Sequence, residues 1–561
     1  MLEYGTIYKK NRGRIMKSAE VIINGKNYIY EVGTTLLEIS KEFKEEYKND
    51  ILVAVLNGKV AELNNVITED STLEFYDISS SLGSLVYENG LTFLLIDSFK
   101  RVLKMDITIN HSIDKGVYFE TSKIISESDL EKIDLDMNEM VQKNVPIEKK
   151  LVNRMEAIKY YTKHREDDKV NILKYTTNTN VNLYKLNNTY DYFFSYLPIS
   201  TGYLKKFNLT YISSNGFVIS YPNLYTNKMH KYKHHEKLFN EFNEYNSWTQ
   251  TLGVRNVTSL NYKISMGNFN DIIFQSEAFQ NNKLYKIAEK IYNNVNSKVI
   301  LISGPSSSGK TTTSKKLKLY LKNFGLDVLS ISIDDFFLDK EDTPRKENGD
   351  YDFESVNAID INLFNKTLKK LISYEKVKLP RYNFILGKKE FETVPTKLNE
   401  NQILIIEGLH ALNDVLTNEI DKKYKFKIYL SPLTVLNIDN HNRFKTTDNR
   451  LLRRIVRDNR TRGYSASDTL ASWNNVREGE EKNIFNFQDS SDVVFNTSLV
   501  YELNVLKTYV EPLLYSVEEN DPNYKEALRL LNLLKNILPM PSEDVPRDSI
   551  IREFIGNSYF E

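Results

Sequence analysis

One octapeptide in this chain has the residue types and the spacing of a phosphate-binding loop. Residues 304–311 read Gly-Pro-Ser-Ser-Ser-Gly-Lys-Thr and fit the pattern G-x-x-x-x-G-K-[ST]. In this pattern the glycines let backbone N–H groups approach phosphate oxygens, the lysine reaches the outer phosphates, and the last hydroxyl can ligate Mg²⁺. A plain glycine–serine turn is the alternative interpretation, but chance matches are rare in a chain with so few glycines. The motif predicts binding of a nucleoside triphosphate.

The segments on either side of this motif have the order that phosphate binding needs. Residues 298–303 are a short apolar run, typical of a buried strand, and residues 311–324 show helical spacing with Gly325 as a stop. A strand, loop and helix in this order bring the positive end of the helix dipole to the anion. We therefore expect the nucleotide to contact Gly304, Pro305, Ser306, Ser307, Ser308, Gly309, Lys310, Thr311 and Thr312.

The composition excludes several classes of protein. Lysine plus arginine and aspartate plus glutamate both number 75, so no net charge draws the chain to nucleic acid or to a membrane. There is no cysteine, which excludes disulfides and thiolate metal sites and fits a reducing compartment. The chain shows neither a signal-peptide core nor a long apolar run. We expect a cytoplasmic protein of about three or four domains that does not contact membranes; no oligomeric state follows from the sequence.

The N-terminal part reads as a short extension followed by a small α/β domain. We expect residues 1–16 to be flexible, with Met1 or Met16 as the start of the chain. Residues 17–80 contain two hairpin signals, Asn24-Gly25 and Asn57-Gly58, with a short helix between them. This order predicts a β-grasp domain. The unit resembles the TGS domain of threonyl-tRNA synthetases and certain GTPases, which implies docking or RNA contact rather than chemistry.

A second module follows a serine- and glycine-rich stretch at residues 79–84, which is typical of a linker. Residues 86–238 alternate helical and strand-like segments and predict an α+β domain. The segments 110–119 and 191–201 resemble core segments of the editing domain of threonyl- and alanyl-tRNA synthetases. The resemblance implies an editing fold for this module.

The residues that hold zinc in those synthetases have no counterpart here. Their editing domains use a His-x-x-x-His pair and a Cys-x-x-x-His pair, whereas residues 90–97 of this chain contain no histidine. Phe193 and Leu197 fall where the second pair is matched. We therefore expect a degenerate editing domain without zinc or hydrolase activity. Its tyrosines, Tyr190, Tyr192 and Tyr196, either fill the core or a domain interface, or offer a stacking surface for a ligand or RNA.

His230 and His234 are a weaker candidate for a metal site. Two histidines four residues apart on a helix can share a metal ion, but four lysines surround them and oppose a cation. We expect a solvated basic face instead. Residues 239–287 then read as a polar helical connector to a nucleotide-binding domain at 288–500, and residues 501–561 as a C-terminal helical segment.

Acidic residues end two further predicted strands. Residues 327–333 form an apolar strand followed by Asp334 and Asp335, and residues 402–407 form another that ends in Glu407. The carboxyl ends of such strands meet beside the phosphate loop. Asp334 is therefore the expected base for a hydroxyl that attacks the γ-phosphate, and Asp335 the expected cap of the next turn. Glu407 and Thr311 are expected to hold Mg²⁺, directly or through water.

Arginines are concentrated in a predicted helix after the fourth strand, residues 426–430. Over residues 450–463 they occur at helical spacing with apolar residues between them, so one side of the helix can pack while the other presents guanidinium groups. The arginines are Arg450, Arg453, Arg454, Arg457, Arg460 and Arg462. Guanidinium groups suit a lid over a triphosphate. A DNA-reading helix and a salt-bridged surface are the alternatives.

Six motifs together resemble the uridine kinase and phosphoribulokinase family over residues 297–500. They are Gly304 to Thr312, Ile333 to Phe337, Tyr351 to Glu354 with Ala358 to Asp360, Leu379 to Phe384, Ile406 to Gly408, and Arg453 to Asp458 with Arg462-Gly463. The resemblance implies a P-loop domain with a doubly wound parallel sheet that uses ATP or GTP with Mg²⁺. Nearly the whole chain resembles bacterial proteins that join such a kinase domain to TGS-like and synthetase-like domains.

The resemblance also implies roles for individual residues. Asp334 becomes the base for a nucleoside 5′-hydroxyl, while Glu354 falls at the ribose position and Tyr382 beside the nucleobase. Arg454, Arg457 and Arg462 fall at phosphate and lid positions; Arg457 joins Asp334 and Lys310 as a catalytic residue, and Arg454 also contacts the acceptor.

Two positions depart from the family pattern. Gly387 stands where uridine kinases carry a histidine that reads the pyrimidine, and Tyr464 replaces an arginine.

The sequence thus predicts an ATP- and Mg²⁺-dependent kinase of a nucleoside 5′-hydroxyl, with uridine or cytidine as the expected acceptor. Another small hydroxyl compound, such as a sugar phosphate or a pantothenate-like acid, is the alternative within enzymes. A nucleotide-gated regulator that associates with RNA or ribosomes is the alternative outside them, because the N-terminal modules have no obvious use in nucleoside salvage.

Overall fold

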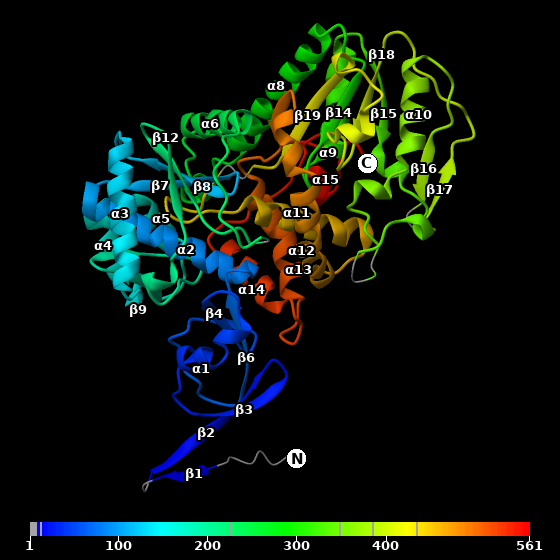
Figure 1. The fold of residues 1–561 in the computed structure, drawn as a ribbon. Helices are drawn as coiled ribbons and strands as arrows, with labels where there is room; N and C mark the ends of the chain where they lie inside the picture. Colours follow the sequence, from blue (N-terminus) through cyan, green and yellow to red (C-terminus); the bar gives the residue numbers. More distant parts are fainter. Residues whose placement is uncertain are drawn as a thin grey trace.

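The computed structural model describes residues 8–11, 14–224, 226–346, 349, 351–383, 386–433 and 436–561. Figure 1 shows a small blue unit at the N-terminal end, a cyan-to-green unit, and a larger unit built around a parallel sheet. We call them the N-terminal, middle and C-terminal domains. No described helix is long and apolar enough to cross a membrane.

The N-terminal domain has the β-grasp arrangement that its two hairpin signals predict. Its elements are β2 (Arg14–Ile23), β3 (Lys26–Glu31), α1 (Leu36–Glu42), β4 (Ile51–Leu56), β5 (Lys59–Ala61) and β6 (Ser71–Asp77). The two hairpins flank β6, which pairs parallel with β2 and antiparallel with β4. Asn24 and Asn57 have positive φ values of 51° and 49°, as tight hairpin turns require. The TGS assignment itself stays a prediction.

Residues 8–11 and 14–16, which are expected to belong to a flexible extension, lie in strands in the structure. β1 (Tyr8–Asn11) pairs antiparallel with the first part of β2, and Lys9 lies opposite Met16. The boundary expected at residue 17 therefore falls inside a strand. Met1, the other candidate start, lies outside the described residues.

The expected linker at residues 79–84 is the start of a helix. Ser80 caps α2 (Ser81–Ser98), because its hydroxyl accepts a hydrogen bond from the N–H of Gly83 at 2.9 Å. Gly83 has no room for a side chain, since an added Cβ would lie 1.9 Å from the carbonyl oxygen of Asp77. Serine and glycine are typical of linkers, but here they form a helix cap, so α2 follows the N-terminal domain without a flexible segment.

The middle domain is the predicted α+β unit. After α2 and a π-helical turn (Phe99–Leu103) come β7 (Ile107–Ile113), β8 (Gly116–Thr121), α3 (Glu127–Lys143), β9 (Glu148–Asn153), α4 (Arg154–His164), α5 (Asp167–Lys174), β10 (Asn180–Leu186), β11 (Thr189–Asp191), β12 (Asn208–Ser213) and β13 (Gly216–Ser220). The strands form two sheets, in the orders β12-β13-β8-β7 and β11-β10-β9. Phe193 and Leu197 are buried in the core, where Phe193 packs against Phe93.

The segment around His230 and His234 is largely exposed, as the expected solvated basic face requires. The described residues between 221 and 235 are irregular, and α6 begins only at Glu236. Lys233 is exposed, as expected, but its Nζ lies 2.6 Å from a carboxylate oxygen of Asp489 in the C-terminal domain. His235 is buried and its Nδ1 lies 2.6 Å from the other oxygen of Asp489. Part of this segment is therefore a domain contact.

The C-terminal domain contains a five-stranded parallel sheet in the order β15-β18-β14-β19-β20. The strands are β14 (Val299–Ser303), β15 (Asp327–Ser332), β18 (Gln402–Glu407), β19 (Lys425–Ser431) and β20 (Val493–Asn496). The first four match the predicted strands. Sequence analysis missed β20, which has only four residues and too short a pattern to detect. A separate hairpin, β16 (Pro380–Asn383) with β17 (Lys388–Phe391), lies beyond β15.

Both faces of this sheet are covered, as the predicted doubly wound fold requires. Along β14, Ile300 and Ile302 belong to one apolar cluster, while Val299 and Leu301 belong to another. The first cluster includes residues of α9 (Lys310–Asn323) and α11 (Thr446–Arg462), and the second includes residues of α10 (Ile361–Ile372). Alternate side chains of a strand point to opposite faces, so the central strand β14 is buried on both sides.

The core of the C-terminal domain extends beyond the expected limits of 288 and 500. The connector is helical as predicted, with α6 (Glu236–Thr251), α7 (Val257–Ser265) and α8 (Asn270–Asn293). The C-terminal segment forms α13 (Glu502–Tyr515), α14 (Tyr524–Leu534) and α15 (Arg552–Ile555). Buried residues of α7, α8 and all three C-terminal helices belong to the same apolar cluster as the sheet. These segments are therefore parts of one domain core.

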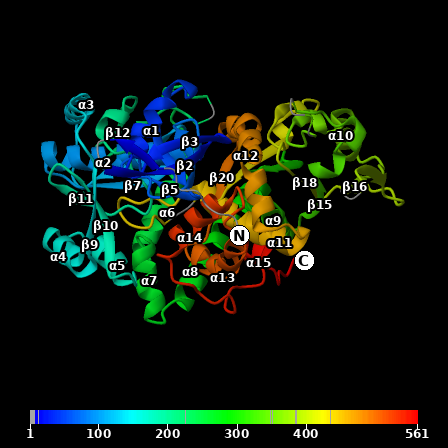
Figure 2. The same cartoon turned by 90° about the horizontal axis from the view of Figure 1, so that it is seen from below.

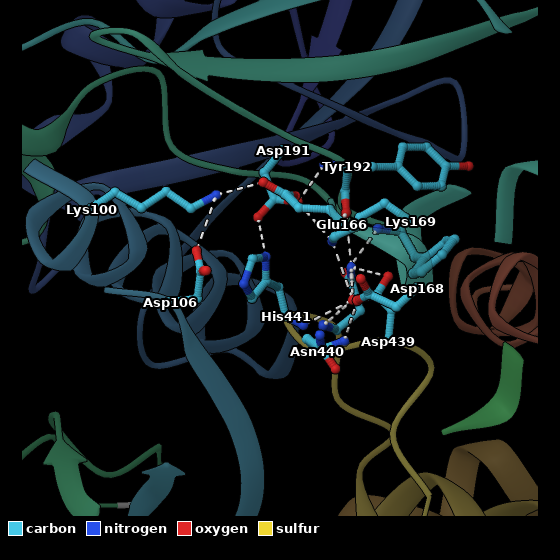
Figure 3. A network of polar contacts seen from close by, with 12 residues as sticks. Lys100, Asp106, Glu166, Asp168, Lys169, Asp191, Tyr192, Asp439, Asn440 and His441 are labelled. Atoms are coloured by element: carbon cyan, nitrogen blue, oxygen red, sulfur yellow. Dashed lines mark hydrogen bonds and ion pairs between the residues drawn. The ribbon is translucent and has the colours of Figure 1, made fainter. Parts of the chain in front are cut away.

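A buried polar network joins the middle and C-terminal domains (Figure 3). Lys169 of α5 is fully buried, and its Nζ lies 2.6 Å from Asp191 and 3.2 Å from Asp439. Asp191 also meets Nδ1 of His441 at 2.6 Å. Burial alone would lower the pKa of Lys169, but the charges of Asp191 and Asp439 outweigh it and hold this pKa above its usual value.

The network holds the loop that leads into α11. Asp439 accepts hydrogen bonds from the N–H groups of His441 and Asn442 at 2.8 and 2.9 Å, which closes this loop on itself. Further along, Arg443 and Lys445 bind Glu88 of α2 at 2.7 and 2.8 Å. The middle domain therefore fixes the N-terminal end of the arginine-rich helix.

We predict that Lys169→Met destabilises the protein strongly, because it leaves Asp191 and Asp439 buried without their cation. Breaking a buried ion pair costs about 3–5 kcal/mol. A thermal melt should show a midpoint several degrees below that of the unchanged protein. Lys174→Met, at the exposed end of the same helix, is the control and should melt within about 1 °C of it. Equal midpoints for the two variants would show that the network contributes nothing.

Candidate active site

The glycine loop, residues 304–309, connects β14 to α9 at the carboxyl edge of the parallel sheet. Gly304 has no room for a side chain, because an added Cβ would lie 2.3 Å from the carbonyl oxygen of Leu430. Ser307 and Gly309 have positive φ values of 59° and 78°. The loop thus leads directly into the N-terminus of α9, where unpaired N–H groups and the helix dipole favour an anion.

Lys310 is folded back over the glycine loop. Its Nζ donates to the carbonyl oxygens of Gly304 at 3.0 Å and Pro305 at 3.3 Å. Burial lowers the pKa of Lys310, while the negative charges of Glu407 and Asp334 oppose this shift. The ammonium group therefore lies among the two acids that the sequence analysis assigns to the same site.

Asp334 and Glu407 come from neighbouring strands. β15 and β18 pair in parallel, and Ser332 lies opposite Glu407, so both acids lie at the same edge of the sheet. Asp334 is an exposed residue. The protein around its carboxyl nevertheless removes part of its hydration and raises its pKa, while the charge of Lys310 opposes this shift. Burial likewise raises the pKa of Glu407 to about 7. The predicted base and the predicted metal ligand are thus brought together beside Lys310.

Asp335 does not cap its own turn, contrary to the sequence-based expectation. Its carboxylate accepts a hydrogen bond from the N–H of Tyr382 at 3.4 Å and lies 3.5 Å from the guanidinium of Arg381. Both partners belong to β16. Asp335 therefore attaches the β16–β17 hairpin to the sheet, while its neighbour Asp334 stays available to a ligand.

Glu354 joins the same group of charges. Burial raises its pKa to about 7, the nearby charge of Glu480 adds to this shift, and Arg454 and Lys310 oppose it. The sequence analysis missed His410, a buried residue next to Glu354 whose pKa burial lowers to about 4. His410 comes three residues after Glu407, at the end of a strand. Its position just after a predicted strand could have identified it as a residue of the site.

Two arginines of α11 lie beneath the glycine loop and do not face a ligand. Arg450 donates from Nε to the carbonyl oxygen of Ser306 at 2.9 Å and pairs with Glu480. Glu480 in turn accepts from the N–H of Ser306 at 2.8 Å. Arg453 donates to the carbonyl oxygen of Ser307 at 3.2 Å and pairs with Glu502 at 2.6 Å. The expectation that all the arginines form an outward face is therefore wrong for these two.

Three of the other predicted lid arginines share one carboxylate. Asp458, which is buried, lies 3.2 Å from Arg454, 2.7 Å from Arg457 and 3.6 Å from Arg462. Arg454 also donates to the hydroxyl of Ser306 at 2.8 Å. These three guanidinium groups are thus collected next to the glycine loop.

The chain can now be compared with known proteins. Residues 299–502 match the model of the Phosphoribulokinase / Uridine kinase family. The C-terminal part of the chain belongs to this family. It is a P-loop kinase domain, and we call it the kinase domain from here on.

The N-terminal part matches threonine–tRNA ligases. That of Carboxydothermus hydrogenoformans is 30% identical over 183 residues, which are 32% of this chain and 29% of that protein. That of Clostridium novyi is 31% identical over 154 residues, which are 27% of this chain and 24% of that protein. The chain thus spans less than a third of the length of these relatives.

Two solved structures also match part of the chain. A possible uridine kinase from Bacillus stearothermophilus has a TM-score of 0.25 and 18% identity, covering 36% of this chain and 89% of that one. The YGR205w protein has a TM-score of 0.27 and 17% identity, covering 39% of this chain and 89% of that one.

The predicted base-recognition residues of the kinase domain lie in its separate hairpin. Tyr382 of β16 is buried against Phe337, with ring centroids 5.7 Å apart. Gly387 has a φ of 66°, and an added Cβ would lie 2.9 Å from Cβ of Lys340. A histidine at residue 387 is therefore sterically disfavoured in this turn. Tyr464 is half-exposed after the lid helix, and Phe384 lies outside the described residues.

The oxygen groups near Lys310 fit Mg²⁺. The hydroxyl of Thr311 is exposed at the start of α9, and the carboxylates of Glu407 and Asp334 lie at the adjacent strand ends. Within the described ranges no three histidine or acidic side chains form a group that could hold a metal ion. Mg²⁺ binds through one or two carboxylates together with substrate phosphates, so it needs no such group. Thr311 and Glu407 are the residues that would hold it.

The raised pKa of Glu407 predicts a pH-dependent stability. Because the folded protein favours the protonated carboxyl, its ionisation destabilises the fold progressively from about pH 4.5 to about pH 7 and fully above that. Glu407→Gln should therefore raise the melting midpoint by roughly 2–4 °C at pH 8 and leave it unchanged at pH 5. The exposed Glu400, just before the same strand, is the control, and Glu400→Gln should change neither value. A shift of the same size at both pH values would contradict the prediction.

Proposed function

We propose that this protein transfers the γ-phosphoryl group of ATP, with Mg²⁺, to the 5′-hydroxyl of a pyrimidine nucleoside. The observation that carries the proposal is the position of Asp334. It follows the strand next but one to the glycine loop, and its charge interacts with that of Lys310. An acceptor hydroxyl at Asp334 would therefore meet a phosphate bound by the loop.

The chemistry follows from this arrangement. The oxygen of the acceptor hydroxyl forms a bond to the γ-phosphorus, and the bond between this phosphorus and the leaving oxygen of ADP breaks. Asp334 accepts the proton of the hydroxyl during this step. The raised pKa of Asp334 favours this step, because a stronger base takes the proton more readily near neutral pH. Lys310 and the lid arginines neutralise charge on the transferred group. Mg²⁺ would supply further neutralisation from Thr311 and Glu407.

The arginines need little rearrangement to reach a triphosphate. Asp458 now balances Arg454, Arg457 and Arg462, and Arg454 already contacts Ser306 of the loop. Phosphate oxygens would compete with this single carboxylate for the three guanidinium groups. In the proposed complex these arginines bind phosphate, and Asp458 keeps them near it before the nucleotide arrives.

Acceptor recognition is assigned to Glu354 and Tyr382, with Arg454 beside them. Glu354 lies among the charges of the site, which suits a carboxylate that binds ribose hydroxyls. Gly387 stands where uridine kinases have a histidine that recognises the pyrimidine. We therefore expect other groups to recognise the base. A sugar phosphate or a pantothenate-like acid is the alternative acceptor.

We predict that Asp334→Asn lowers turnover by about 10²–10⁴-fold, the usual contribution of a general base. The Kd for ATP should stay within about twofold, because asparagine has the same shape and the phosphates bind elsewhere. Turnover is measured by ADP release and Kd by calorimetry. Asp342→Asn is the matched control, since Asp342 is exposed on the next turn. Normal turnover in Asp334→Asn would exclude Asp334 as the base.

A panel of acceptors tests the substrate. ATP consumption should increase with uridine or cytidine and stay at background with a sugar phosphate or pantothenate. Glu354→Gln should raise KM for the nucleoside while leaving the Kd for ATP unchanged. A panel in which only a non-nucleoside increases ATP consumption would refute the nucleoside assignment and keep the kinase chemistry.

The second candidate function is a nucleotide-gated regulator that associates with RNA. It is favoured by one observation, the match of the N-terminal part to threonine–tRNA ligases. The neutral overall charge predicts little non-specific RNA retention. RNA that stays with the purified protein through a moderate-salt wash would therefore support this function, and its absence would weigh against it.

A further inference from the structure

The last residues of the chain lie on the glycine loop. In Figures 1 and 2, α15 and the C-terminus lie beside α9 and α11. The side chain of Ile550 is so close to Gly309 that an added Cβ would lie 2.6 Å from it. Phe560 accepts a hydrogen bond at its carbonyl oxygen from Lys315 of α9 at 2.7 Å. This contact is not predictable from the sequence, because residues 501–561 contain no motif of nucleotide binding.

A carboxylate of this segment accepts a hydrogen bond from a backbone N–H group at the start of α9. The N–H of Thr312 donates to Oε2 of Glu553 at 3.0 Å. Thr312 is the third residue of α9, so its N–H has no acceptor within the helix. The first turn of the helix after a glycine loop is where a phosphate binds, through such N–H groups and the helix dipole. Glu553 thus supplies the anion that a nucleotide would otherwise supply.

The residue after Glu553 reinforces this arrangement. The guanidinium of Arg453 lies over the ring of Phe554, 4.8 Å from its centroid. Arg460 of the lid helix donates to the carbonyl oxygens of Glu553 and Phe554 at 3.1 and 3.2 Å. The segment therefore contacts α9 through the carboxylate of Glu553 and α11 through the ring of Phe554. A nucleotide likewise combines an anionic group with an aromatic ring.

We propose that the carboxylate of Glu553 is an intramolecular occupant of the nucleotide site, and that a nucleotide binds only when Glu553 leaves Thr312. This inference rests on the nucleotide binding proposed above. A triphosphate and Glu553 compete for one N–H, and the charge of Glu553 also acts on Lys310 and Glu407. The displaced group is the side chain of Glu553 alone, because its neighbours Phe554 and Ile555 are buried in the core. The apparent Kd for the nucleotide is then the intrinsic Kd divided by the fraction of molecules in which the site is open.

Calorimetric titration with Mg²⁺-ATP tests the competition. Glu553→Gln removes the charge and Glu553→Ala removes the acceptor, so both should bind ATP about 3- to 10-fold more tightly than the unchanged protein. Glu543→Gln, the same change at an exposed position before α15, should leave the Kd unchanged. Unchanged or weaker binding in both Glu553 variants would refute the inference, and weaker binding would make Glu553 part of the nucleotide site.

Hydrogen exchange supplies a second readout that does not depend on turnover. Without ATP, Glu553→Ala should accelerate exchange of the Thr312 amide, which loses its acceptor, and saturating ATP should restore the protection in this variant. If ATP binds and the Thr312 amide exchanges equally fast in the unchanged protein and in Glu553→Ala, with and without ATP, the carboxylate does not occupy this N–H and the inference is wrong. If neither the unchanged protein nor any variant binds ATP, both the proposed function and this inference fail. If all of them bind ATP equally well, only this inference fails.

Discussion

Two buried arginine–glutamate pairs beneath the glycine loop are the interaction on which the site depends. Arg450 with Glu480, and Arg453 with Glu502, hold the backbone of Ser306 and Ser307. A buried charge is tolerated only when it is paired and fully hydrogen-bonded, so each pair fixes the loop and the lid helix relative to each other. The same helix carries Asp458, which gathers the three outer arginines.

The middle domain acts on this arrangement from the other end of the helix. Asp439 and His441 belong to the loop before α11, and Lys169 and Asp191 hold them in a buried network. Glu88 binds the next two basic residues. The middle domain thus has a structural use here, because it positions the start of the lid helix of the kinase domain.

The C-terminal segment meets the same helix from the opposite side. Arg453 and Arg460 each contact the polypeptide around Phe554, and Glu553 binds the N-terminus of α9. The lid helix therefore contacts the glycine loop and the C-terminal segment, and the loop directly before it contacts the middle domain.

The sequence by itself determined the glycine loop, four of the five parallel strands, the arginine helix and the β-grasp hairpins, because each of these is a local pattern of apolar period, glycine or turn residues. It also placed Asp334 and Glu407 at adjacent strand ends. Only the tertiary structure decided that Ser80 caps a helix, that Arg450 and Arg453 face inward, and that His410 lies beside Glu354. It alone brought Glu553 to Thr312, which is 241 residues away. Such pairings depend on which buried charges meet, and no local pattern records a contact between distant segments.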